Sequence, residues 1–133
     1  MSKIRVLMCP ADRAPYITNI ENSLKNMQNV VGGYIESVTL SHNPHVVLIC
    51  NEEGRINGLP QNHSLPSPQI FGYALAEFDI HGDCFLCGAN GEEFADLPEP
   101  RSQWLQSAKG MWKAWNEAGK EYRNCMILRE EKE

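Results

Sequence analysis

Hydrophobic and polar residues in the first half of the chain form patterns that are typical of β-strands. Lys3–Cys9 is rich in strand-forming residues, and the short segment Tyr16–Thr18 is expected to pair with it. Tyr34–Leu40 alternates between two faces, and the continuous apolar run Val46–Cys50 is typical of a buried central strand. The turn Ser41–Pro44 between these two runs predicts a β-hairpin.

One segment of the N-terminal half has the spacing of an amphipathic helix. Apolar residues recur at intervals of four, three and four positions, at Ile20, Leu24, Met27 and Val31. Asn19 is expected to cap the N-terminus of this helix. Gly32-Gly33 is expected to end it, because glycine adopts the left-handed conformation without a Cβ penalty. We predict a helix of about three turns.

The second half of the chain predicts one further strand and one long helix. Cys84–Cys87 is apolar and reads as the last strand, and Asn90-Gly91 predicts a turn after it. Ile70–Ile80 fits a strand, a short helix, or one after the other. Arg101–Leu128 is predicted to be helical, because its apolar side chains share one stripe: Trp104, Leu105, Ala108, Met111, Trp112, Trp115, Ala118 and Tyr122.

These elements predict an α+β fold: a mainly antiparallel sheet of four to six strands with one packed helix and a long C-terminal helix. We expect an α+β core over residues 1–97 and a tryptophan-rich helix over residues 98–133, separated by prolines. That helix packs on its own core or forms the interface of a homodimer. Its expected contact residues are Trp104, Met111, Trp112 and Trp115.

Composition narrows the class of protein. The chain has 133 residues, five cysteines and a net charge of −5, which suits a single hydrophobic core. The mild acidity argues against general nucleic-acid binding. An odd number of cysteines without an export signal favours reduced thiols. No apolar run reaches the roughly 18 residues that a membrane span needs. We expect a cytoplasmic protein without a cofactor.

The polar segment from Asn51 to Pro68 is the first candidate for a binding site, because long irregular segments are uncommon unless they are functional. Asparagine and glutamine amides can read a base edge or a ribose, and an arginine can pair with a phosphate. The predicted ligand-binding residues are Asn51, Arg55, Asn57, Gln61, Asn62 and His63. The alternative is a turn held by asparagine side chains that bond the neighbouring backbone.

The residues support metal binding and catalysis less well than they support ligand binding. A structural zinc site needs four ligands, whereas Cys84 and Cys87 form one pair whose members point to opposite faces of a strand. We therefore predict buried thiols and no metal site. An enzyme that uses His63, His81 or Cys84 stays open as an alternative, but no catalytic constellation is present, and we expect no enzyme and no catalytic residues.

Three motifs occur in a fixed order: Val30–Glu36 (VVGGYIE), Asn51–Gly54 (NEEG) and Gly58–Asn62 (GLPQN). In combination they resemble the domain-of-unknown-function 3846 family over residues 3–97, with the helix from Arg101 looking like an addition. The family is common in phages, plasmids and other mobile elements and offers no catalytic residues to transfer. The resemblance implies a small cytosolic protein of a mobile element, and such proteins often counter host defence.

From the polar segment and this resemblance we expect a protein that binds and sequesters a small, nucleotide-derived signal of host defence. The alternative is a protein–protein inhibitor or adaptor that acts on a host defence enzyme through the C-terminal helix. We expect a homodimer in both cases, with no membrane partner.

Overall fold

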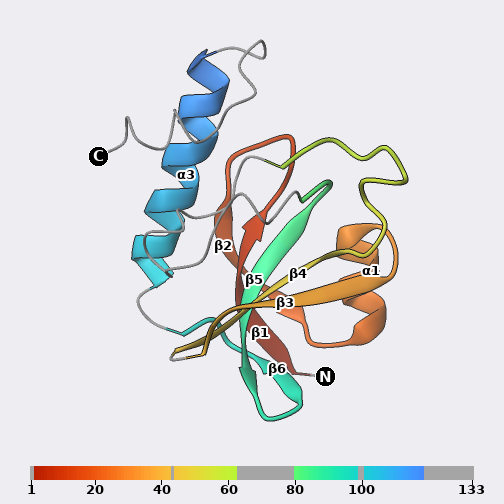
Figure 1. Cartoon of the computed structure of the whole chain (residues 1–133). Coiled ribbons are helices and arrows are strands. Elements are labelled where there is room, and N and C mark those ends of the chain that lie inside the picture. The colour runs from red at the N-terminus through yellow and green to blue at the C-terminus, as the bar shows by residue number, and fades with distance from the viewer. Residues whose placement is uncertain (1, 43, 63–79, 99–100, 119–133) are drawn as a thin grey trace.

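The computed structural model describes residues 2–42, 44–62, 80–98 and 101–118, and in them the chain forms one antiparallel sheet flanked by helices (Figure 1). Five strands lie in the order β2-β1-β5-β4-β3, and β6 also pairs with β5. The predicted mainly antiparallel sheet with helices packed on it is thereby confirmed, whereas the predicted length of the C-terminal helix is not. The strands are β1 (Lys3–Cys9), β2 (Tyr16–Glu21), β3 (Ile35–His42), β4 (His45–Asn51), β5 (Cys84–Asn90) and β6 (Glu93–Ala95).

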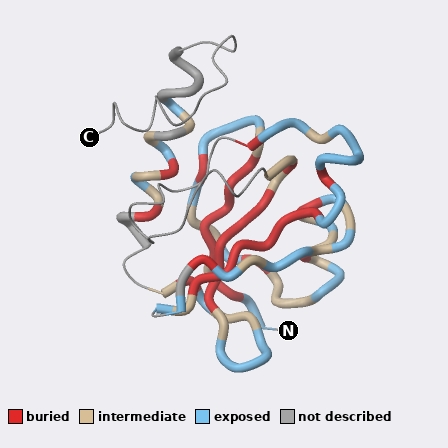
Figure 2. The backbone as a smooth tube through the Cα atoms, in the orientation of Figure 1, coloured by how far each residue is buried: buried red, intermediate tan, exposed pale blue. Residues whose placement is uncertain are grey.

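Each face of the sheet has its own apolar core, because successive residues of a strand point to opposite sides. Helix α1 (Leu24–Val31) covers one face, where Met27 and Val31 pack against a group of strand residues, Val6, Met8, Val47, Ile49, Phe85 and Cys87. Helix α3 (Arg101–Ala118) covers the other face. Its Trp104 and Ala108 pack there against Leu7, Cys9, Leu48, Cys84 and Leu86. Figure 2 shows the buried central strands between the two helices.

The prediction that Cys84 and Cys87 are buried thiols on opposite faces of a strand is confirmed by this arrangement. Cys84 and Cys87 belong to the cores on opposite faces of β5, and both are fully buried. Within the described residues, no group of three or more histidine, cysteine, aspartate or glutamate side chains is placed to hold a metal ion. Nor is any described helix both long and apolar enough to cross a bilayer.

The predicted start of the first helix is wrong, whereas its end is confirmed. Asn19 and Ile20 lie in β2, which pairs with β1 as far as Glu21. Ser23 caps the helix instead, and its Oγ accepts a hydrogen bond from the Asn26 N–H at 3.2 Å. The apolar spacing from Ile20 to Leu24 therefore spans a strand and a helix. Gly32 takes the left-handed conformation at φ +83° and ends α1.

The two predicted strands around Ser41–Pro44 form the expected hairpin of β3 and β4. Cys84–Cys87 is the start of β5, but β5 is not the last strand, because β6 follows the Asn90-Gly91 turn and pairs back onto it. At Gly88 a Cβ would lie within 2.3 Å of the Asp96 carbonyl oxygen, so this return requires glycine. A three-residue strand such as β6 is too short for a sequence pattern to reveal.

Part of the predicted C-terminal stripe packs on its own chain. Trp104 is 2% exposed and lies in the core with Ala108, whereas Trp112 is half-buried. The side chains of Met111 and Trp115 lie outside the described residues, as do His63, most of the Ile70–Ile80 segment and the predicted helix beyond Ala118.

Candidate functional site

The predicted binding segment is a compact loop after β4. Backbone hydrogen bonds close it, running from Gly54 to Asn51 (3.4 Å), Asn57 to Glu53 (2.9 Å), Gly58 to Arg55 (3.2 Å) and Leu59 to Gly54 (2.9 Å). Further bonds tie it to the segment before β5, from Asn62 to Ile80 (2.8 Å) and from Gly82 to Pro60 (2.7 Å). Gly54 lies so close to the His81 carbonyl that a Cβ would stand 2.4 Å from it. The loop therefore has a defined shape.

Asn51 joins this loop to the end of α1. Its side chain is buried, and Nδ2 donates to the Val31 carbonyl at 3.0 Å while Oδ1 accepts the Glu53 N–H at 2.7 Å. Gly33 passes directly over the amide, where a Cβ would lie 2.8 Å from Nδ2. Both ends of the Asn51 amide are thus used to hold the backbone.

Asn62 has the same role at the other end of the loop. Its buried Nδ2 donates to the carbonyl oxygens of Cys9 at 2.7 Å and Gly82 at 2.8 Å, and lies 3.6 Å from the Cys84 Sγ. The arrangement of Asn51 and Asn62 matches the alternative interpretation, in which asparagine side chains hold a turn. Asn51 and Asn62 therefore position the loop.

The other predicted ligand residues within the described part of the chain lie on the outer surface of the loop. Arg55, Asn57 and Gln61 are exposed, and Ile56 between them is 83% exposed. The six predicted residues are therefore not gathered around one cavity: two are buried, three face outwards, and His63 lies outside the described residues.

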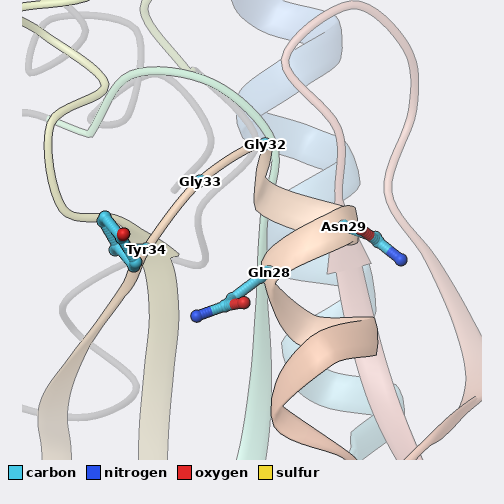
Figure 3. Close-up of a pocket in the computed structure, with 5 residues that line it drawn as sticks. All are labelled: Gln28, Asn29, Gly32, Gly33 and Tyr34. Atoms are coloured by element: carbon cyan, nitrogen blue, oxygen red, sulfur yellow. The ribbon is translucent and has the colours of Figure 1, made fainter.

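A shallow pocket of about 330 Å³ lies at the end of α1, beside the start of the loop. Its lining residues are Gln28, Asn29, Gly32, Gly33 and Tyr34. Figure 3 shows the Gln28 side chain extending toward the side where Tyr34 lies, whereas Asn29 points away. Tyr34 is 71% exposed, and its carbonyl accepts the Glu52 N–H at 2.9 Å, which connects the pocket to the loop.

Sequence reasoning missed the pocket residues Gln28 and Tyr34. A signal was present, because an aromatic residue directly after the Gly32-Gly33 helix stop stands at the start of an edge strand, where it is easily exposed. Chemically the pocket offers an amide with donors and an acceptor, an aromatic face and glycine backbone without side-chain cover. These groups suit the binding of a planar, polar molecule.

The buried thiols are poorly suited to nucleophilic chemistry. Burial raises the pKa of Cys87 to about 12 and that of Cys50 to about 11. The hydrogen bond with Cys9, and then burial, raise the pKa of Cys84 well above its ordinary value. With pKa values this high, these three thiols stay protonated at neutral pH. They are therefore inert, because the thiolate is the nucleophile. His81 is also engaged, with Nδ1 at 2.9 Å from the Leu59 carbonyl oxygen.

Comparison with known proteins places the chain in a family. No curated protein and no solved structure matches it. A family model described as a domain of unknown function, DUF3846, matches residues 4–109. The match runs into α3, so the expectation that the helix from Arg101 is an addition is wrong for residues 101–109. The region matched contains the pocket, the loop and Trp104, and the chain belongs to the DUF3846 family.

Proposed function

We propose that the protein binds and sequesters a small, nucleotide-derived signal, and that the pocket at the end of α1 holds the base of this ligand. The observation that carries the proposal is the 71% exposed Tyr34 ring at a pocket that also presents Gln28. Stacking of a base on an aromatic side chain is worth about 1–3 kcal/mol.

The loop after β4 provides the second half of the proposed site. The Glu52–Tyr34 hydrogen bond joins this loop to the pocket, and Arg55 and Asn57 lie on its exposed surface. In the proposed complex these two side chains contact the ribose and phosphate portions of the ligand. The buried amides of Asn51 and Asn62 maintain the loop in the required position.

Binding of the ligand without chemical change agrees with the two cysteines of β5. Cys84 and Cys87 are buried, and their pKa values are raised, so neither supplies a reactive thiolate. The family resemblance implies a protein of a mobile element, and sequestering a defence signal would benefit such an element. A protein that removes a signalling nucleotide would counter a host defence that depends on this signal.

A thermal-shift screen against linear and cyclic nucleotides tests the proposal. A ligand at a hundredfold excess over its Kd stabilises the native state by about 2.7 kcal/mol, which raises the Tm by several degrees. We expect Tyr34→Ala and Gln28→Ala to abolish the shift. Lys25→Ala is the matched control, because this exposed side chain lies on the same helix outside the lining of the pocket, and its loss should leave the shift intact.

Mass spectrometry of the ligand released by denaturation separates capture from catalysis. Recovery of the intact ligand supports sequestration, whereas recovery of an altered ligand identifies an enzyme. Absence of a shift across the whole panel contradicts the proposal.

An adaptor that acts through the C-terminal helix is supported less well. Trp104 and Ala108, which the adaptor would need at its surface, lie in the core of their own chain. We expect removal of the residues after Pro98 to unfold the protein, because it exposes the sheet face that Trp104 covers. A truncated protein that stays folded but loses a host partner would favour the adaptor.

A further inference from the structure

The pocket lies at the negative end of a helix dipole. Gln28, Asn29 and Gly32 belong to the last turn and cap of α1, where a helix carries the equivalent of about −0.5 elementary charge. No basic residue lies in that last turn. The Gln28 carbonyl accepts both the Gly32 and Gly33 N–H groups, so this end of the helix presents acceptors and the glycine donors point inwards.

The surroundings of the pocket add little positive charge. All five lining residues are uncharged. Glu36 follows Tyr34 by two residues, and Glu52 donates its backbone N–H to the Tyr34 carbonyl and is followed by Glu53; all three carboxylates are exposed. The cations Lys25 and Arg55 are exposed on the first turn of α1 and on the loop, outside the lining. An anion in the pocket would therefore meet repulsion without a paired cation.

Resting on the proposed function, we infer that the pocket takes an uncharged heteroaromatic base with an exocyclic amino group, of the adenine type, and that the phosphates stay outside it. Phosphates bind where N–H donors and cations converge, at helix N-termini and arginines. A helix C-terminus offers the opposite and favours an amino donor. The Gln28 amide completes the match, because glutamine pairs in a bidentate manner with the amino group and ring nitrogen of adenine.

Isothermal titration with three probes tests this assignment: adenosine, inosine, in which an oxo group replaces the amino group, and adenosine monophosphate. We expect adenosine and its monophosphate to bind within about threefold of each other, because Arg55, the cation proposed to meet the phosphate, is exposed to solvent, where an ion pair contributes little. Inosine is expected to bind roughly tenfold more weakly or worse. Gln28→Leu should remove the preference for adenosine over inosine, whereas Lys25→Leu, on the same helix but outside the lining, should retain it.

Several outcomes overturn the inference and leave the proposed function in place. One is tight, salt-dependent binding of the monophosphate without binding of adenosine. Equal affinities for adenosine and inosine are another, as is a signal nucleotide that binds but carries no amino-bearing base. Tighter binding of free arginine than of adenosine would identify the pocket as a cation site and overturn the inference too. If no nucleoside or nucleotide binds, the proposed function fails together with it.

Discussion

Two pairs of amide side chains in this protein have similar chemistry and different surroundings. Asn51 and Asn62 are 6% and 7% exposed, and their amides bond backbone groups of α1, β1 and the loop itself. Gln28 and Asn29 stand on the surface of α1, and Gln28 faces a pocket. Buried polar groups must find partners within the protein, which leaves no capacity for a ligand. Burial, and not residue type, therefore decides which amides can recognise another molecule.

The same contrast divides the family motifs. Asn51, Gly54 and Asn62 build the loop, since each lies where its side chain bonds the backbone or where a Cβ would collide with it. Arg55 and Ile56, between the motifs, face outwards. The motif residues thus hold the loop in shape, whereas Arg55 and Ile56 between the motifs form part of its outer surface.

The largest expected effect comes from removing a buried amide. Asn62→Ala takes the side-chain donor from the buried carbonyl groups of Cys9 and Gly82. We expect a loss of about 3 kcal/mol in the free energy of unfolding, measured by urea denaturation, because each unsatisfied buried group costs about 1–3 kcal/mol. Asn57→Ala on the exposed surface of the same loop is the control and should change stability by about 0.5 kcal/mol at most. Equal stability of the two variants would contradict a structural role for the buried Asn62 amide.

A pH titration extends the comparison to a buried thiol. Burial raises the pKa of Cys87 to about 12 in the folded state, whereas an unfolded thiol ionises near pH 8.5. Above the unfolded pKa the unfolded state has lost a proton that the folded state retains, so stability falls as the pH rises. We expect Cys87 to contribute a loss of about 3 kcal/mol by pH 11.

The control for this titration is Cys87→Ala, which lacks the thiol. Its unfolding free energy should fall less steeply between pH 9 and pH 11 than that of the natural protein. Parallel profiles would show that the Cys87 thiol ionises as readily in the folded state as in the unfolded state.

A smaller effect is expected where Gly33 crosses Asn51. In Gly33→Ala the added Cβ would meet Nδ2 at 2.8 Å, so the Asn51 amide must move and its bond to Val31 weakens. We expect a cost of about 1–2 kcal/mol, as for other overpacked sites. In a double-mutant cycle with Asn51→Ala, the double variant should lose less stability than the sum of the two single losses. Strict additivity would mean that the two positions act independently.

The smallest expected effect belongs to the pocket amide. Gln28→Ala should change the free energy of unfolding by about 0.5 kcal/mol at most, because the side chain bonds no described residue and alanine suits a helix. Thermal and urea unfolding would measure it. A loss comparable with that of Asn62→Ala would reveal a structural role and weaken the proposed binding site.

Several elements were predictable because their signals are local. The alternation in Tyr34–Leu40, the apolar run Val46–Cys50 and the glycine stop at Gly32 each depend on neighbouring residues, and each corresponds to an observed element. The start of α1 was not predictable, since pairing with β1 draws Ile20 into a strand. The binding segment was recognised as a loop, but its polar residues could not be sorted into buried and exposed from the sequence.

The sequence by itself determined most of the strands, the glycine stop of α1 and the family to which the chain belongs. Tertiary structure alone decided which polar groups remain available for binding. The reason is physical: hydrogen-bond capacity is the same for every asparagine, but Asn51 and Asn62 lie where β4 meets α1 and where the loop meets β1 and β5. Contacts between segments far apart in the chain occupy the hydrogen-bonding groups of those two amides. The same contacts place Tyr34 and Gln28 at an open pocket.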